Sequence, residues 1–213
     1  CPAPTGPQSI VGCPFDPAQH WLLGTVGRMQ AVKDQTTLAQ AFVQAMASAP
    51  QLKANLRLVM IGDGPLRGQA QAILDQAGLG DLAWLPGERS DVADIMRGLH
   101  AFALPSLAEG ISNTILEAMA SALPVIATAV GGNADLVQQP DTGSIVPAAD
   151  PSAMAQQIID LASNPRLAHQ MGLAGRQRVL DRFSMQSMVS TYQRVYNQQL
   201  SLSAALRAKR SSA

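Results

Sequence analysis

Two of the three glutamates in this chain, Glu109 and Glu117, flank one predicted helix start. Ser112 or Asn113 is a suitable N-cap, which places Glu109 in the preceding loop and Glu117 in the first turn or just beyond it. The free N–H groups of a helix start can bind a diphosphate. Carboxylates suit hydroxyl-rich groups, because they accept charge-assisted hydrogen bonds from sugar hydroxyls. The pattern favours a ligand with both kinds of group, although Glu117 alone could simply complement the helix dipole.

Two cations, Arg28 and Lys33, bracket the turn after the first predicted strand. Both would face the same edge of the sheet if the next helix begins near Asp34. An arginine fork matches phosphate geometry, and lysine adds a point charge. We expect these two side chains to neutralise a phosphate-bearing ligand; the alternative is a pair of solvated surface cations.

Glycine follows nearly every predicted strand. In an open parallel sheet, ligands bind beyond the carboxyl ends of the strands, and glycine lets the backbone approach a ligand. Any one of these turns could be only a tight connection, but five on one edge favour a phosphate-bearing ligand. They are centred on Gly27, on Gly62-Asp63-Gly64, on Gly87, on Gly110 and on Gly131-Gly132.

Three other nucleotide or catalytic motifs are incomplete. In the segment after the second strand the third glycine of G-x-G-x-x-G would be Gly68, which comes one position late. We therefore do not expect a Rossmann oxidoreductase. The chain has no G-x-x-x-x-G-K-[ST] loop, and Ser106 does not lie in the G-x-S-x-G elbow of hydrolases.

Short apolar runs that alternate with helical patterns predict a parallel sheet built from βαβ units. The fold class is α/β: a single, Rossmann-like, doubly wound domain with a six-stranded parallel sheet and C-terminal helices. The predicted strands are Trp21–Val26, Leu56–Ile61, Leu82–Leu85, Ala101–Leu104, Val125–Val130 and Ser144–Val146. The predicted helices are Thr36–Ala49, Leu66–Ala77, Val92–Leu99, Asn113–Ala122, Asn133–Gln138, Ser152–Ser163, Arg166–Asp181 and Met185–Leu206.

The composition excludes several classes of protein. Fifteen basic residues balance fifteen acidic ones, and a neutral chain has no electrostatic footprint for nucleic acid. No apolar run reaches the roughly 18 residues that a membrane span needs, and no signal peptide is visible. Two cysteines, Cys1 and Cys13, fit neither a zinc pattern nor a disulfide framework. We expect a cytoplasmic protein and, since the chain begins at Cys1 rather than at Met, a fragment of a longer one.

Five elements in order resemble glycosyltransferase family 4, the retaining enzymes of the GT-B fold. The strongest is the E-x7-E motif from Glu109 to Glu117, followed by Ala118-Met119-Ala120. The others are Val26-Gly27-Arg28 with Lys33, Ile61-Gly62-Asp63-Gly64-Pro65, Gly131-Gly132 and Thr142-Gly143. The sequence within and around these motifs is similar to that of sugar transferases associated with bacterial exopolysaccharide and exosortase gene clusters.

The resemblance implies a role for each site residue. Glu109 would contact the donor sugar, Glu117 would hold the ribose hydroxyls, and Arg28 and Lys33 would neutralise the leaving diphosphate. The loop from Gly87 to Arg89 would recognise the base. The further residues implied in donor binding are Gly27, Gly62, Gly110, Ile111, Ser112, Asn113 and Thr114. No cofactor and no metal are expected, because the chain lacks an Asp-x-Asp pair that would hold one.

The resemblance also implies that one half of the GT-B fold is missing from this chain. Residues 20–200 would form the donor-binding domain, between an irregular arm or linker at 1–19 and a basic tail at 201–213. The partners would be a nucleotide sugar and an N-terminal acceptor domain, with peripheral contact to the inner face of a membrane in the full enzyme. The fragment would bind donor and transfer sugar poorly or not at all. Asp135 departs from the pattern, since the family often has glutamate there.

Two rival interpretations share this architecture: a nucleotide-binding module without catalysis, and a nucleotide-sugar epimerase or phosphorylase. The intact set of Glu109, Glu117, Arg28 and Lys33 argues against the first, and the combination of motifs argues against the second.

Overall fold

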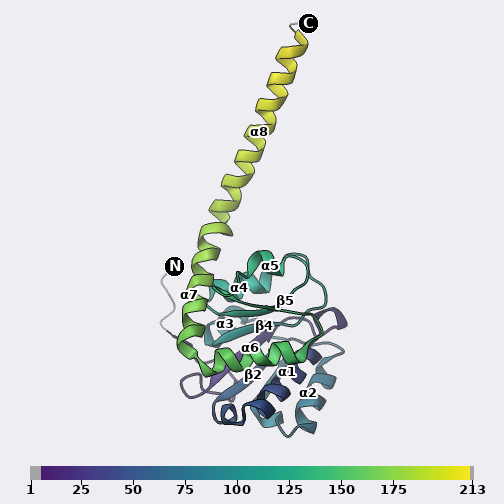
Figure 1. The fold of residues 1–213 in the computed structure, drawn as a ribbon, viewed down its shortest axis with the longest axis vertical. Coiled ribbons are helices and arrows are strands. Elements are labelled where there is room, and N and C mark those ends of the chain that lie inside the picture. Colours follow the sequence, from purple (N-terminus) through teal and green to yellow (C-terminus); the bar gives the residue numbers. More distant parts are fainter. Residues whose placement is uncertain (1–5, 212–213) are drawn as a thin grey trace. The chain divides into compact units, whose positions relative to one another are not determined.

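A computed structural model describes residues 6–211, and side chains for residues 6–200 apart from Met185 and Met188. Its centre is a six-stranded sheet in the order β3-β2-β1-β4-β5-β6, and every neighbouring pair is parallel (Figure 1). The predicted doubly wound α/β fold is therefore confirmed. The strands are β1 Trp21–Val26, β2 Leu56–Ile61, β3 Ala83–Gly87, β4 Ala101–Leu104, β5 Val125–Thr128 and β6 Gly143–Val146.

Helices connect successive strands and follow the last one. They are α1 Gln35–Ser48, α2 Arg67–Gln76, α3 Val92–Gly98, α4 Asn113–Ala120, α5 Asn133–Leu136, α6 Pro151–Ser163, α7 Pro165–Arg182 and α8 Met185–Ser211. Short 3-10 turns lie at Ala31–Lys33, Pro50–Ala54 and Gly80–Leu82. Asp34 caps α1, since its carboxylate accepts hydrogen bonds from the Thr37 N–H and from both threonine hydroxyls of the first turn.

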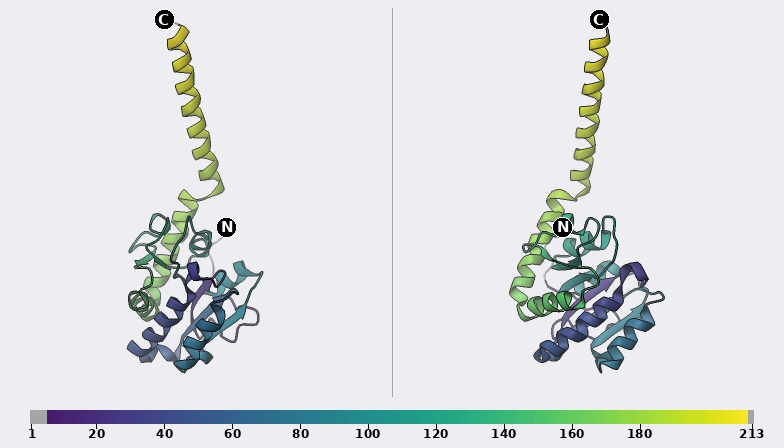
Figure 2. Two further views of the ribbon diagram at one scale, coloured as in Figure 1. Left: turned by 90° about the vertical axis from the view of Figure 1, so that its right-hand side faces the viewer. Right: turned by 45° about the vertical axis from the view of Figure 1, so that its right-hand side comes forward.

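Helices cover both faces of the sheet. Helices α1, α2 and α6 pack beside one another on one face, and α3, α4 and α5 lie on the other (Figures 1 and 2). Neighbouring residues of β1, such as Leu22 and Leu23, point to opposite faces, and both are fully buried. This explains why the strands appear in the sequence as continuous apolar runs rather than as alternating patterns.

Four strand boundaries differ from the sequence prediction. Strand β3 begins at Ala83 rather than at Leu82, and β6 begins at Gly143 rather than at Ser144. Strand β3 ends at Gly87 rather than at Leu85, and so includes Pro86. Proline is tolerated there because β3 is an edge strand, where a missing N–H need not break the sheet. Strand β5 ends at Thr128 rather than at Val130, since its last partner in β6 is Val146.

The segment before β1 is irregular but packed. Ile10 and Phe15 are buried, and the Gln8 N–H donates a hydrogen bond to the Arg97 carbonyl at the end of α3. The first described residues are therefore part of the α/β unit.

The chain divides into two compact units at Arg176–Gln177. The first holds the sheet and its covering helices. The second contains the end of α7 and all of α8, which includes most of the segment predicted as a tail. Within residues 6–211, no helix has both the length and the apolar character needed to cross a membrane.

Candidate functional site

The order in which the chain adds strands to the sheet reverses between β1 and β4. From β1 the chain builds outward to β2 and β3, and from β4 it builds the other way to β5 and β6. The loops after β1 and β4 diverge from this point, which is where open α/β sheets bind ligands. The Leu107 N–H donates a hydrogen bond of 2.8 Å to the Val32 carbonyl and so joins the two loops.

An ion pair spans this switch point. Lys33 Nζ, in the connection from β1 to α1, lies 2.5 Å from Glu109 Oε1, in the connection from β4 to α4. The Glu109 side chain is 9% exposed and the Lys33 side chain 30%. The structure thus brings together two residues that the sequence assigned to different parts of a ligand.

A buried hydroxyl supports the same carboxylate. Ser106 Oγ donates to Glu109 Oε1 at 2.7 Å, and Ser106 itself is fully buried directly after β4. Thr128, at the end of β5, donates to the Ser106 carbonyl at 2.6 Å. The Asn133 side-chain amide donates in turn to the Thr128 carbonyl at 3.0 Å. Sequence reasoning missed these three residues as parts of the site. Ser106 and Thr128 are marked only by a position after a strand or at its end, and Asn133 only by its place at the start of α5.

Glycine allows the loops of this edge to pack closely. A Cβ on Gly131 would lie 1.9 Å from the Glu109 carbonyl oxygen, and Gly131 has φ of 52°. A Cβ on Gly62 would lie 2.0 Å from the Gly27 carbonyl oxygen, and Gly62 has φ of 130°. Only glycine fits both demands, so these residues fix the loops against one another.

Arg28 and Arg89 line a pocket at the carboxyl ends of β1, β2 and β3. Its volume is about 260 Å³. The pocket is lined by Val26, Gly27, Arg28, Ile61, Gly62, Asp63, Glu88 and Arg89. Arg28 is exposed, and among the described residues its guanidinium forms no ion pair. Its backbone is held by Gln35, which donates from Nε2 to the Arg28 carbonyl at 2.9 Å.

Arg89 is occupied by protein contacts. It donates two hydrogen bonds to the Asp91 carboxylate, at 2.8 and 2.7 Å, and one of 3.1 Å to the Val11 carbonyl. This pairing lowers the pKa of Asp91 below its ordinary value. The guanidinium also lies over the Trp84 ring, 5.7 Å from its centroid. Arg89 therefore ties the segment before β1 to the loop after β3.

The start of α4 follows the sequence prediction closely. Ser112 is the N-cap, and its hydroxyl accepts from the Ile115 N–H at 3.5 Å and lies 3.0 Å from Thr114 Oγ1. Asn113 is exposed, and Ile111 is 60% exposed in the loop before the cap. Gly110, next to Glu109, accepts a hydrogen bond from the Gly132 N–H.

Glu117 lies apart from Glu109. It is exposed on α4, where it lines a shallow pocket between α3 and α4 together with Val92, Ala93, Met96, Ala120 and Ser121. Asp135, the departure from the family pattern, is exposed on α5. Within the described residues, no three His, Cys, Asp or Glu side chains gather as a metal-binding group.

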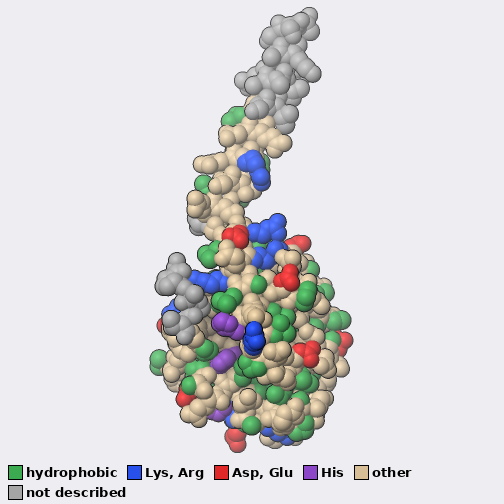
Figure 3. Space-filling model, turned by 60° about the vertical axis from the view of Figure 1, so that its left-hand side comes forward, with side chains coloured by type: hydrophobic (Ala, Val, Ile, Leu, Met, Phe, Trp, Pro, Cys, Tyr) green, Lys and Arg blue, Asp and Glu red, His purple; other side chains and the backbone are tan. Residues whose placement is uncertain are grey.

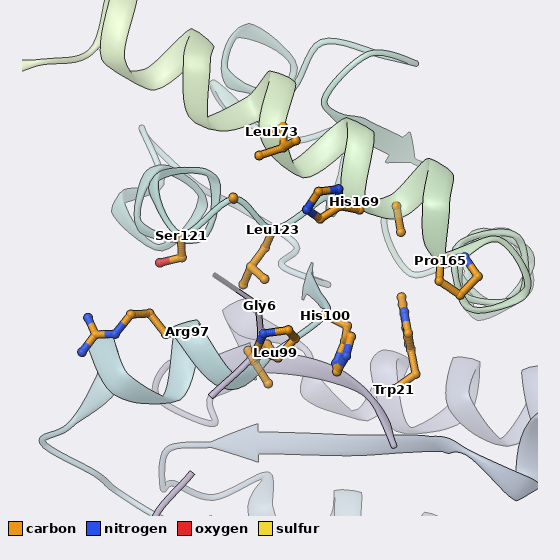
Figure 4. A pocket seen from close by; sticks show the side chains of 13 residues that line it. Gly6, Trp21, Arg97, Leu99, His100, Ser121, Leu123, Pro165, His169 and Leu173 are labelled. Atoms are coloured by element: carbon orange, nitrogen blue, oxygen red, sulfur yellow. The ribbon is translucent and has the colours of Figure 1, made fainter. Parts of the chain in front are cut away.

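A further pocket lies at the amino ends of the strands, opposite this edge. Trp21 begins β1, His100 precedes β4 and Leu123 precedes β5; His169 and Leu173 reach the pocket from α7 (Figure 4). Histidine side chains are also visible on the face of the α/β unit drawn in Figure 3. His100 Nδ1 accepts a hydrogen bond from the Leu22 N–H, and burial lowers the pKa of His100 to about 4. None of the predicted site residues lines this pocket.

The strand order defines a Rossmann-like α/β domain that matches GT-B glycosyltransferase folds. The chain belongs to the family described as glycosyl transferases group 1, whose model matches residues 21–164.

Individual relatives agree with this family. The lipopolysaccharide core biosynthesis mannosyltransferase LpcC of Rhizobium leguminosarum is 29% identical over 188 residues, 85% of this chain and 51% of that protein. The first curated relatives are matched over less than half of their own length.

Solved structures share the fold. A mutant of S. aureus TarM, in complex with Fondaparinux, alpha-GlcNAc-glycerol and UDP, has a TM-score of 0.78 at 20% identity, covering 92% of this chain and 37% of that one. The C-terminal domain of a glycosyl transferase group 1 family protein (LpcC) from Francisella tularensis has a TM-score of 0.71 at 22% identity, covering 78% of this chain and 87% of that one.

Proposed function

We propose that this chain is the donor-binding domain of a retaining glycosyltransferase of family 4. It binds a nucleoside-diphosphate sugar, and the complete enzyme transfers a hexose to a glycan or lipid-linked acceptor in bacterial polysaccharide synthesis. The proposed role in polysaccharide synthesis rests on the residues of the motifs, which resemble those of exopolysaccharide transferases. A lipopolysaccharide core mannosyltransferase among the relatives supports it.

The observation that carries the proposal is the Lys33–Glu109 pair at the switch point of the sheet, on the same edge as the Arg28 pocket at the ends of β1, β2 and β3. A carboxylate there suits sugar hydroxyls, and cations there suit a diphosphate that gains negative charge as it leaves. The exposed Arg28 guanidinium supplies one such charge. UDP in the TarM complex shows that a neighbour of this fold binds a nucleoside diphosphate.

Each remaining site residue has a proposed role. Glu117 holds the ribose hydroxyls, and the loop at Gly87 to Arg89 contacts the base, together with the backbone near Gly27 and Gly62. The segment from Gly110 to Thr114 provides N–H groups around the sugar and phosphates. We propose that no metal takes part, since Arg28 and Lys33 supply the positive charge that a metal would otherwise bring.

We propose that transfer needs a second domain. Apart from Glu117 on α4, the site residues lie at one edge of one sheet. Water at an open edge screens the electrostatic stabilisation that group transfer requires. An N-terminal acceptor domain would close the cleft, with the enzyme working in the cytoplasm at the inner face of the membrane.

A thermal-shift panel tests donor binding. The chain is heated with UDP, GDP and ADP, and with UDP-glucose, GDP-mannose and ADP-glucose. We expect the nucleotides of one base to raise the melting temperature of the chain, since a ligand that binds only the folded state stabilises it. A chain that responds to none of the six would contradict the proposed function.

A labelling experiment tests the need for a second domain. The chain and a two-domain enzyme that includes it are incubated with labelled donor and a bacterial membrane extract. We expect transfer by the two-domain form alone, with the anomeric configuration retained. Robust transfer by the 213-residue chain would refute the half-enzyme proposal, and inversion would refute the assignment to family 4.

A further inference from the structure

We propose that Ser106 is a positioning residue, which fixes the Glu109 carboxylate so that one oxygen is held by the protein and the other is left for a hydroxyl of the donor sugar. The inference rests on the proposed function and extends it to a residue that the E-x7-E motif does not include.

The two oxygens of Glu109 differ in their surroundings. Oε1 accepts hydrogen bonds from both Lys33 Nζ, at 2.5 Å, and Ser106 Oγ, at 2.7 Å. Within the described part of the chain, no hydrogen bond reaches Oε2. A carboxylate held through one oxygen keeps the acceptor capacity of the other, and a charged acceptor forms strong hydrogen bonds with hydroxyl groups.

Ser106 is suited to hold this geometry because it cannot move easily. It is 0% exposed and follows Pro105, whose ring restricts the backbone. Its carbonyl accepts the Thr128 hydroxyl at 2.6 Å, and Thr128 is also 0% exposed. Asn133 holds the Thr128 carbonyl at 3.0 Å from α5. The carboxylate is therefore connected, through Ser106, to the ends of β4 and β5.

Lys33 is a poor candidate for the same task. Its side chain is long, 30% exposed, and has four rotatable bonds in its flexible stem. In the proposed function it also contacts the diphosphate, which competes with Glu109 for its charge. When Lys33 turns to the diphosphate, Ser106 is the one described side chain that still donates to Oε1. Ser106 would then decide how well Glu109 recognises the sugar.

The test compares binding of a nucleoside diphosphate with binding of its sugar conjugate, by calorimetry on the 213-residue chain. The pairs are UDP and UDP-glucose, GDP and GDP-mannose, and ADP and ADP-glucose. The variants are Ser106→Ala, which removes the hydroxyl, and Ser106→Cys, which keeps its approximate shape with a weak donor. Ser106→Thr restores a hydroxyl. Ser144→Ala is the matched control, a buried serine on β6 with no hydrogen bond to Glu109.

We expect Ser106→Ala to reduce the preference for the sugar conjugate over the free diphosphate by roughly 10- to 100-fold, the effect of losing a hydrogen bond to a charged group. Ser106→Cys should show a loss in the same direction, Ser106→Thr should recover part of the preference, and Ser144→Ala should keep it. A purely structural role would weaken both ligands equally. Thermal unfolding of each variant shows whether the fold is retained, and Ser106→Cys serves if Ser106→Ala does not fold.

Two outcomes overturn different statements. If the unaltered chain binds none of the six ligands, the proposed function is wrong and this inference falls with it. If the unaltered chain prefers a sugar conjugate, and the folded Ser106 variants keep that preference, Ser106 does not position Glu109 and the inference alone is overturned.

Discussion

Lys33 Nζ lies 2.5 Å from Glu109 Oε1, although the two residues are 76 positions apart in the sequence. The pair joins the loop after β1 to the loop after β4, which are neighbours only because of the strand order. The Glu109 side chain is nearly buried, so loss of Lys33 would remove the ion-pair partner of a carboxylate that water reaches poorly.

The energetic coupling of this pair can be measured with a double-mutant cycle of Lys33→Met and Glu109→Gln. We expect a coupling of about 1–2 kcal/mol, between the values for exposed and for buried pairs, because Lys33 is partly exposed. Urea unfolding of the four proteins gives the value. Additive effects of the two substitutions would show that the contact does not stabilise the folded state.

Glu109→Gln and Glu117→Gln should affect different parts of the donor. Glu117 lies on the exposed face of α4, away from Glu109. We expect Glu117→Gln to weaken binding of free nucleoside diphosphate, and Glu109→Gln to weaken mainly the contribution of the sugar, each by roughly 1.5–3 kcal/mol. Calorimetry with the diphosphate and its sugar conjugate separates the two. Asp81→Asn, at the opposite end of the sheet, is the control. Equal losses of affinity for free diphosphate in both Glu variants would show that the roles are wrongly divided.

Donor binding should not need a divalent metal. Arg28 and Lys33 lie at the proposed phosphate site, and fixed cations there can stabilise the diphosphate without a metal ion. We expect the affinity for nucleoside diphosphate to be the same with EDTA as with added magnesium. Calorimetry under both conditions makes the comparison. A strict requirement for magnesium would contradict the proposed use of these two side chains.

Gly131→Ala should destabilise the domain. The new Cβ would lie 1.9 Å from the Glu109 carbonyl oxygen, at a residue whose φ of 52° already disfavours a side chain. We expect a loss of roughly 1–3 kcal/mol in the free energy of unfolding. Gly68→Ala, in α2 with open space around it, is the control and should be neutral or stabilising. Similar stability of both variants would mean that the two loops can separate at little cost.

The stability of the domain should fall in mild acid because of His100. Burial lowers its pKa in the folded state to about 4, against 6.5 ordinarily, so the unfolded chain binds more protons between these values. Stability is therefore fully present above pH 6.5 and is lost as the pH falls towards 4, by up to about 3 kcal/mol.

The variant His100→Asn tests this origin, because Asn can keep an acceptor for the Leu22 N–H without titrating. We expect the loss of stability between pH 6.5 and 4 to shrink in this variant. His169→Asn, at an exposed position, should behave like the unaltered chain. An unchanged pH dependence in His100→Asn would assign the acid sensitivity to other groups.

The sequence by itself determined the elements and their order. Apolar runs such as Leu56–Ile61 are too uniform for half-exposed strands, and their alternation with helical patterns leaves a parallel sheet as the simple solution. It also determined much of the local site chemistry: an N-cap at Ser112 or Asn113, of which the structure selects Ser112, Glu109 in the loop before it, and glycine at the turns. These features depend on neighbouring residues, so local physics is sufficient to predict them.

Tertiary structure decided which of these residues meet. The strand order places Lys33 against Glu109 and leaves Glu117 in a separate pocket. The spacing of residues along the sequence does not specify that strand order. Tertiary structure also tied Arg89 to Asp91 and to Val11, and selected buried Ser106 as the support of Glu109. The contacts of Lys33 with Glu109 and of Arg89 with Val11 join residues 76 and 78 positions apart, and they form only when the sheet has brought the loops together.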